Sequence, residues 1–376
     1  MAAPQSRTSA GLAARLAGKR VLVCVGAGGV GKTTTSAALA LGLARGGRKV
    51  AVVTIDPAKR LASALGLERL ASEPHQIDPR ALRAAGVGGK GELWAMMLDT
   101  KRTFDEVVAR LASDERSRQE ILANPIYKEL STAVAGSQEL SAVAKLYELY
   151  EEHDFEVIVL DTPPSRNALD FLEAPGRLLG FLEGRALQVF LAPSGLTARL
   201  FGRGTALVFS IFARVTGVDM LGELSNFFRT LSSVIEGFGQ RTRDVEALLR
   251  GPETSFLIVT SPESEPAAEA LFLSERLAAA DMSADALIIN RTHLDGLGGH
   301  PPDEVVGLLA GELGDPLAER VASNLADFDV LARRDRDSIE RLASAVRGSA
   351  PIVIPQLDED VEDLLGLARV AEHLFE

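Results

Sequence analysis

The segment 20–45 constrains the fold more than any other part of the chain. It starts with the apolar run RVLVCV, turns through the glycine-rich residues GAGGVGKTT at 26–34, and continues as an alanine- and leucine-rich stretch that stops at Gly46 and Gly47. A parallel strand and a helix joined by such a turn direct successive backbone N–H groups at phosphate oxygens. We therefore expect a phosphate-binding loop, or P-loop, at this position.

Short apolar runs recur along the chain and are separated by stretches with helical periodicity. This alternation predicts an α/β fold of the P-loop NTPase type, in which a mostly parallel sheet of about seven strands is flanked by helices. The predicted strands are Arg20–Val25, Lys49–Ile55, Leu93–Leu98, Phe155–Leu160, Ser255–Thr260, Ala286–Ile289 and Ile352–Ile354.

Two long stretches without strand patterns interrupt the alternation. We predict a flexible tail at 1–18, a P-loop ATPase domain formed by 19–99, 154–170 and 251–376, and an inserted helical subdomain formed by 100–153 and 171–250. The stretch Phe171–Phe238 holds nine of the fifteen phenylalanines of the chain. These side chains form either an apolar groove for a client or the subdomain's own core or a dimer interface.

Charge and cysteine content exclude several classes of protein. The formal net charge of −12 argues against nucleic-acid binding, which needs a basic face. No apolar run reaches the length of a membrane span, and the first 18 residues lack the apolar core of a signal peptide, so we expect a cytoplasmic protein. The single cysteine excludes a disulfide framework and a site made of several thiolates from one chain.

The P-loop and two later aspartates supply the candidate site. Lys32 is expected to reach the β- and γ-phosphates of ATP and the Thr33 hydroxyl to bind Mg²⁺. Asp56 and Asp161 each follow or close an apolar strand, where ligands bind in open α/β sheets, so both are candidate Mg²⁺ ligands and Asp56 is a candidate for orienting the attacking water. The expected nucleotide-binding residues of the loop are Gly26, Ala27, Gly28, Gly29, Val30, Gly31, Lys32, Thr33 and Thr34.

The motifs GGVGKTT, TIDPAKRL and LDTPPSRNALDFL resemble those of the ArsA-type ATPases of the deviant Walker A class, a family that includes arsenite-pump ATPases and a targeting factor for tail-anchored membrane proteins. The resemblance runs from Arg20 to about Phe375. It implies that Asp56 is the switch I aspartate acting on the attacking water and that Asp161 is the switch II aspartate reading the γ-phosphate through Mg²⁺. It also implies that Asn290, in the motif LIINR, helps to hold adenine.

The sequence departs from this family at three places. Ala27 replaces the signature lysine that, in the family, reaches the partner's nucleotide across a dimer, and Lys59, Arg60 and Arg166 are the cations in the chain that could substitute for it. The CxxC pair that binds zinc between subunits is missing, and so is the thiolate triad that binds arsenite. Ala27 favours a dimer with a paralogous chain that carries the lysine, with a monomer or a homodimer as the alternatives.

Two functions follow from these features. The first is a cytosolic Mg²⁺-dependent ATPase whose nucleotide state switches the helical subdomain, for handling a membrane protein or another hydrophobic client. The second is a nucleotide-binding regulatory subunit of a heteromeric ATPase with little hydrolysis of its own, which Ala27 favours and the retained Lys32, Thr33, Asp56 and Asp161 oppose. A subunit of an arsenite pump is disfavoured by the missing thiolates.

Overall fold

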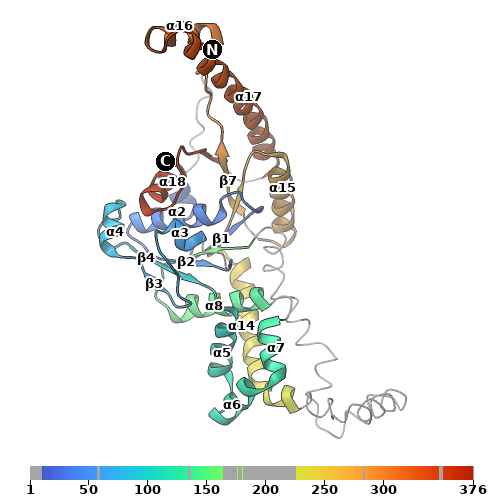
Figure 1. The fold of residues 1–376 in the computed structure, drawn as a ribbon. Coiled ribbons are helices and arrows are strands. Elements are labelled where there is room, and N and C mark those ends of the chain that lie inside the picture. The colour runs from blue at the N-terminus through green and yellow to red at the C-terminus, as the bar shows by residue number, and fades with distance from the viewer. Residues whose placement is uncertain are drawn as a thin grey trace. The chain divides into compact units, whose positions relative to one another are not determined.

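The computed structural model describes residues 11–56, 60–133, 137–163, 226–282, 284–346 and 350–375, together with Gly176 and Gly180. The chain forms two compact units (Figure 1). Unit 1 comprises Met1–Met97, Phe155–Leu169 and Leu249–Glu376, and unit 2 comprises Leu98–Asp154 and Asp170–Leu248. The predicted tail lies mostly outside the described residues, and so does most of Phe171–Phe238.

Unit 1 is built on an eight-stranded sheet in the order β3-β4-β2-β5-β1-β6-β7-β8. All neighbouring strands are parallel except β3, which pairs antiparallel with β4. The predicted α/β fold is confirmed, and the seven predicted strands are present. The two-residue β3 is additional, and nothing in so short a segment could have been recognised from its pattern. The strands are β1 (Val21–Val25), β2 (Lys49–Thr54), β3 (His75–Gln76), β4 (Glu92–Met97), β5 (Val157–Asp161), β6 (Thr254–Thr260), β7 (Ala284–Thr292) and β8 (Ile352–Pro355).

The central strands are apolar on both faces because helices cover both. One face, with Leu22, Cys24 and Val52, packs with α2 and α18 in the main core. On the other face, α15 packs against β6 and β7. The helices of unit 1 are α1 (Leu12–Arg15), α2 (Lys32–Arg45), α3 (Arg60–Ala64), α4 (Pro79–Ala84), α15 (Ser264–Ala279), α16 (Pro302–Leu313), α17 (Asp315–Ala345) and α18 (Leu364–Phe375).

Unit 2 is helical in its described part. The helices are α5 (Thr100–Leu111), α6 (Glu115–Ala123), α7 (Pro125–Ala133), α8 (Ser137–Glu152) and α14 (Ser232–Arg250), whose last two residues belong to unit 1. Asp99 and Asp114 cap α5 and α6 by accepting hydrogen bonds from the backbone N–H groups of Arg102 and Ser117. The apolar core of the unit includes Val107, Ile121, Tyr127, Phe227 and Phe238.

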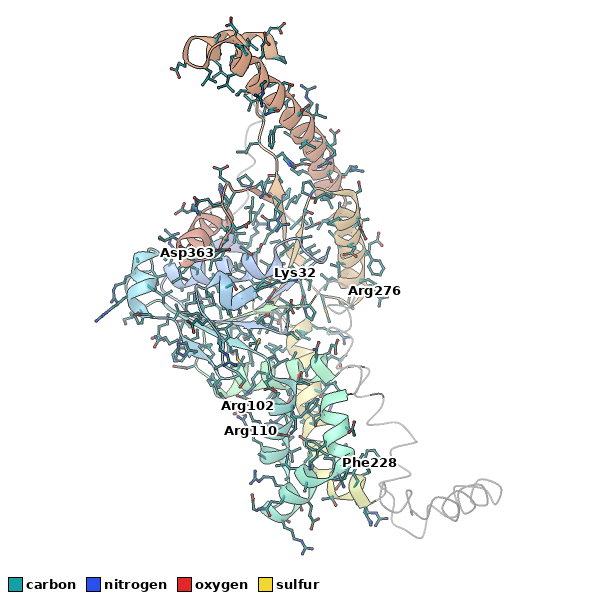
Figure 2. The ribbon with its side chains drawn as sticks, viewed as in Figure 1. Lys32, Arg102, Arg110, Phe228, Arg276 and Asp363 are labelled. Carbon is teal, nitrogen blue, oxygen red and sulfur yellow. The ribbon has the colours of Figure 1, made fainter. Side chains whose placement is uncertain are left out.

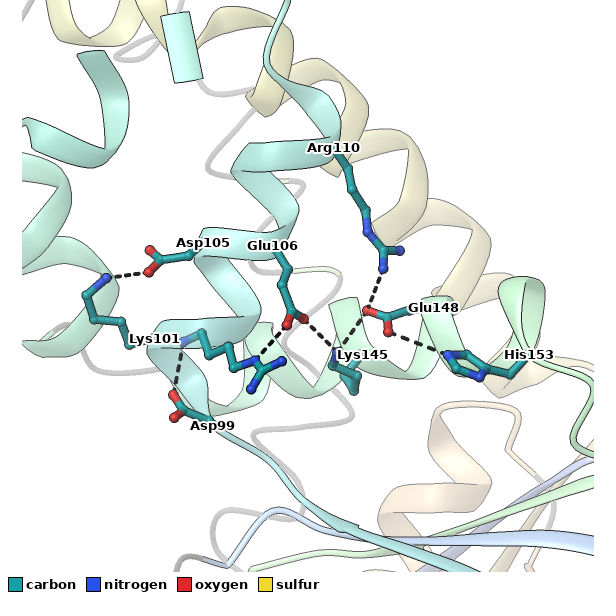
Figure 3. A network of polar contacts seen from close by, with 9 residues as sticks. Asp99, Lys101, Asp105, Glu106, Arg110, Lys145, Glu148 and His153 are labelled. Carbon is teal, nitrogen blue, oxygen red and sulfur yellow. Dashed lines mark hydrogen bonds and ion pairs between the residues drawn. The ribbon is translucent and has the colours of Figure 1, made fainter. Parts of the chain in front are cut away.

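A buried lysine joins α5 to α8 inside unit 2 (Figure 3). The Lys145 side chain is 2 % exposed, and its Nζ lies 2.8 Å from Oε2 of Glu106 and 2.9 Å from Oε2 of Glu148. Burial by itself would lower the pKa of Lys145, but the hydrogen bonds to the two carboxylates raise it above its ordinary value. Arg110 adds a second cation 3.5 Å from Glu148. The ammonium group is therefore charged and compensated.

The described helices include none that combines the length and the apolar character needed to cross a membrane.

Candidate active site

The P-loop lies where the sequence places it, between β1 and α2, and two of its glycines are required by close contacts. A Cβ atom at Gly26 would stand 1.9 Å from the carbonyl oxygen of Val259, and one at Gly31 would stand 2.3 Å from Nδ2 of Asn290. Gly31 also has a φ of 91°, in the left-handed region that favours glycine. The backbone of β6 therefore excludes a larger residue at Gly26, whereas at Gly31 the backbone conformation disfavours one and Asn290 would have to move.

Lys32 folds back over its own loop. It is the first residue of α2 and lies in unit 1. Figure 2 labels it together with Arg102, Arg110 and Phe228, which belong to unit 2. Its Nζ donates hydrogen bonds to the carbonyl oxygens of Gly26, at 3.0 Å, and Ala27, at 2.7 Å. Burial lowers the pKa of Lys32, and the nearby Asp161 acts in the opposite direction. The ammonium group thus lies over the P-loop and donates to neutral carbonyl oxygens. A phosphate bound in the loop would offer it charged acceptors, which form stronger hydrogen bonds.

Asp161 is the most constrained acidic residue of the site. It is fully buried at the end of β5, next to Cys24 of β1 and Thr54 of β2 in the sheet register. Its Oδ2 accepts hydrogen bonds from the hydroxyls of Thr33, at 2.8 Å, and Thr54, at 2.9 Å. Its Oδ1 is buried and has no partner among the described residues. Burial raises the pKa of Asp161 to about 6, although both hydroxyls act to lower it.

Thr54 connects the two aspartates of the site, and the sequence analysis did not identify it. The hydroxyl of Thr54 donates to Asp161 and accepts a hydrogen bond from the backbone N–H of Asp56, at 3.2 Å. Thr54 is 1 % exposed and is the last residue of β2. A hydroxyl residue at the end of a strand directly before a candidate aspartate is the signal that could have identified it.

Asp56 stands at the rim of the site, with a side chain 22 % exposed. Arg60, at the start of α3, approaches it to 3.9 Å between Nη1 and Oδ2. Of the three candidate cations, Lys59 and Arg166 lie outside the described residues. Arg60 is described, and it lies close to Asp56. A carboxylate at this rim can accept a hydrogen bond from a water molecule next to the loop.

Asn290 and Ala27 each make contacts that their motifs did not indicate. Asn290 Nδ2 donates to the carbonyl oxygen of Val30, at 2.9 Å, so the end of β7 is fastened to the P-loop. Ala27 is only 5 % exposed and packs in the main core. A lysine at this position would have to direct its stem out of the core before its charge could reach a second chain.

A cavity of about 600 Å³ within unit 1 is lined by part of the P-loop and by Asp56 and Asn290, but not by Asp161 or Thr54. Its size is within the range of small-molecule sites. The C-terminal segment 354–362 also lines it, a contribution that sequence reasoning missed because this segment carries no recognisable motif. Other lining residues include Gly31, Lys32, Thr33, Thr34, Asp56, Arg60, Asn290 and Arg291.

The chain matches the family described as anion-transporting ATPase over residues 19–296. It is 28% identical over 271 residues to the ATPase GET3 of Malassezia globosa, which covers 72% of each chain. It is 26% identical over 266 residues to the ATPase GET3 of Podospora anserina, which covers 71% of each chain. With the ATPase get3 of Schizosaccharomyces japonicus it shares 27% identity over 275 residues, 72% of this chain and 74% of the relative.

Proposed function

The chain belongs to the anion-transporting ATPase family, and from this premise we propose that it hydrolyses Mg²⁺-ATP in the cavity beside the P-loop. The observation that carries the proposal is the state of Asp161, which is fully buried, holds two hydroxyls on one oxygen and leaves the other oxygen without a partner among the described residues. An open, buried carboxylate is costly in the free protein. It is useful when a cation and a phosphate complete its surroundings.

The donor set suits Mg²⁺, which prefers carboxylate, hydroxyl, phosphate and water oxygens. Thr33 and Asp161 would hold the ion directly or through water, and Asp56 would contribute from the rim. When bound, the ion would neutralise charge on the β- and γ-phosphates. The test is whether Mg²⁺ strengthens ATP binding in the wild-type protein and ceases to do so in Asp161→Asn, measured by calorimetry.

Lys32 supports the binding of the phosphates. Its two bonds to loop carbonyls can be exchanged for bonds to the β- and γ-phosphates without moving α2. We expect Lys32→Ala to weaken ATP binding at least tenfold, about 1.4 kcal/mol. Lys19→Ala, which removes a lysine bound to Asp285 and Thr254 near the start of β1, is the matched control. Equal affinities of all three proteins would contradict the assignment.

Asp56 serves the chemical step in this proposal. It would orient the attacking water through a hydrogen bond to its carboxylate, and it is held toward Asp161 by the Thr54 hydroxyl. Asp56→Asn should lower the turnover number about 10²-fold while ATP affinity changes little. A loss of affinity with turnover intact would instead show that Asp56 acts only through the metal.

Ala27 favours an unlike partner for full activity. Without a lysine at this position, two copies of the chain facing each other would leave the phosphate charges uncompensated, and a paralogue with the lysine would correct one site. Turnover by the chain alone, compared with the chain plus such a paralogue, tests this. High turnover of the isolated chain would refute it, whereas nucleotide binding without turnover in either condition would support the alternative of a regulatory subunit.

The helical subdomain is the proposed responder to the nucleotide state, acting on a hydrophobic client in the cytoplasm. The support is the phenylalanine content of Phe171–Phe238 and its position directly after the strand that ends at Asp161. Hydrogen exchange of α5–α8 should differ between ADP and a non-hydrolysable ATP analogue, and a 20-residue apolar helical peptide should bind in one state only. Cys24 is fully buried and burial raises its pKa to about 12, so it supplies no thiolate for arsenite.

A further inference from the structure

The helices α16 and α17 form a hairpin beyond the segment matched to the family, which ends at residue 296. Gly314, with a φ of 77°, joins them, and they pack through a small core that includes Val305, Ala322 and Leu325. At 31 residues, α17 is about 46 Å long. It also packs against α15 and β7 (Figure 1).

Apolar side chains that meet water are concentrated on this hairpin. Of the nine large hydrophobic side chains that are exposed among the described residues, five belong to α16 and α17. They are Leu308, Leu313, Leu317, Phe328 and Val330. Such a concentration on one element marks an interaction surface more often than scattered exposed residues do.

On α17 four apolar residues and one asparagine form a stripe with coiled-coil spacing. The stripe is Leu317, Val321, Asn324, Phe328 and Leu331, at intervals of four, three, four and three residues. All five are exposed or half-buried, whereas Ala318, Ala322, Asp329 and Ala332 on the neighbouring face are buried. At 3.6 residues per turn, the two faces are separated by roughly 100° of rotation about the helix. The 3.5-residue spacing is the pattern by which one helix packs along another.

The charges beside the stripe are self-complementary. Arg320 and Asp327 are exposed, lie seven residues apart along the same edge, and make no ion pair with any described side chain. In an antiparallel pair of identical helices aligned so that Val321 faces Asn324, each Arg320 faces the Asp327 of the other copy, and the contact occurs twice by symmetry. In a parallel pair this edge would face the edge that carries Ala318, which offers no charge.

We propose that α17 is a self-association surface, on which a second copy of this chain docks its own α17 antiparallel. In this register Leu317 packs on Phe328 of the second copy, and Val321 packs on Asn324. Because this contact is confined to five stripe positions and one charged edge of each helix, we expect a concentration-dependent association with a dissociation constant on the order of micromolar. It involves neither the P-loop nor nucleotide, and it therefore stands independently of the ATPase proposal.

Charge reversal tests the pairing in the nucleotide-free full-length protein by sedimentation velocity. Arg320→Asp and Asp327→Arg each place like charges opposite one another and should weaken association at least tenfold. The double variant Arg320→Asp/Asp327→Arg should restore it to within about threefold, because the pairs re-form with exchanged signs. Glu340→Arg reverses an exposed charge nearer the C-terminal end of α17 and is the matched control, which should leave the association unchanged.

Disulfide trapping tests the register. Val321→Cys and Asn324→Cys, mixed as two single variants and mildly oxidised, should give far more covalent dimer than either variant alone. The native Cys24 does not interfere because it is fully buried. A protein that stays monomeric to 100 µM, a double charge variant without rescue, or efficient trapping between two copies of the same variant would each overturn the proposal.

Discussion

Replacing Asp161 by asparagine should make the nucleotide-free protein more stable at neutral pH while it removes the cation site. The wild-type carboxylate is fully buried, and burial raises its pKa to about 6 from an ordinary 3.8. Asparagine keeps one side-chain oxygen for the hydroxyls of Thr33 and Thr54. Its amide takes the place of an oxygen that already lacks a partner among the described residues, so the hydrogen-bond deficit stays similar and the charge disappears.

The magnitude follows from the pKa difference. The pKa of Asp161 is higher in the folded than in the unfolded protein, so the native state binds the proton more tightly. The free energy of unfolding therefore falls progressively between about pH 4 and pH 6, as Asp161 ionises. Roughly two pKa units at about 1.4 kcal/mol each give a full penalty of about 3 kcal/mol above pH 7. Asp161→Asn should therefore gain about 3 kcal/mol at pH 8 and about half of that at pH 5.

The single tryptophan makes the assay selective. Trp94 lies on β4 in unit 1, so its fluorescence during urea unfolding reports on the unit that contains Asp161. Asp335→Asn is the control, because that buried carboxylate pairs with Arg334 and accepts a hydrogen bond from the backbone N–H of His293, so the variant should lose at least about 1 kcal/mol. A destabilised Asp161→Asn at pH 8, or a gain that is the same at pH 5 and pH 8, would refute the reasoning.

Three further substitutions follow from single contacts. Thr54→Val removes a hydrogen bond that lowers the pKa of Asp161, so the acid limb of the pH–rate profile should move to higher pH, with Thr54→Ser restoring it. Asn290→Ala frees the carbonyl of the P-loop residue that it binds and should weaken ATP binding about fivefold in a titration, whereas unchanged binding would make this contact irrelevant. Lys145→Met removes the buried cation that Glu106 and Glu148 share, leaving only Arg102 and Arg110 beside them, and should cost about 3–5 kcal/mol by circular dichroism of urea unfolding. Lys101→Met, in an exposed pair, should cost under about 1 kcal/mol, and similar losses in the two variants would contradict the role of burial.

The sequence predicted those features whose cause is local in the chain. A strand, a glycine-rich turn and a helix lie within 20–45, and their spacing alone predicts a phosphate loop because the backbone geometry is built from neighbouring residues. The seven apolar runs predicted seven strands for the same reason, since a strand buried on both faces must be apolar throughout. The carboxyl ends of parallel strands lie at one edge of the sheet, so the aspartates at the ends of two of these strands were predicted to lie at the ligand site.

Tertiary structure decided the features that depend on which distant segments become neighbours. The order of the strands places Thr54 opposite Asp161, although 107 residues separate them, and so turns an ordinary threonine into a link between two aspartates. Folding likewise buries Ala27 and fastens Asn290 to the P-loop, neither of which the spacing of motifs could indicate. The physical reason is that burial and hydrogen bonding depend on the three-dimensional surroundings of a side chain, whereas a sequence pattern reports only the periodicity of its own strand or helix.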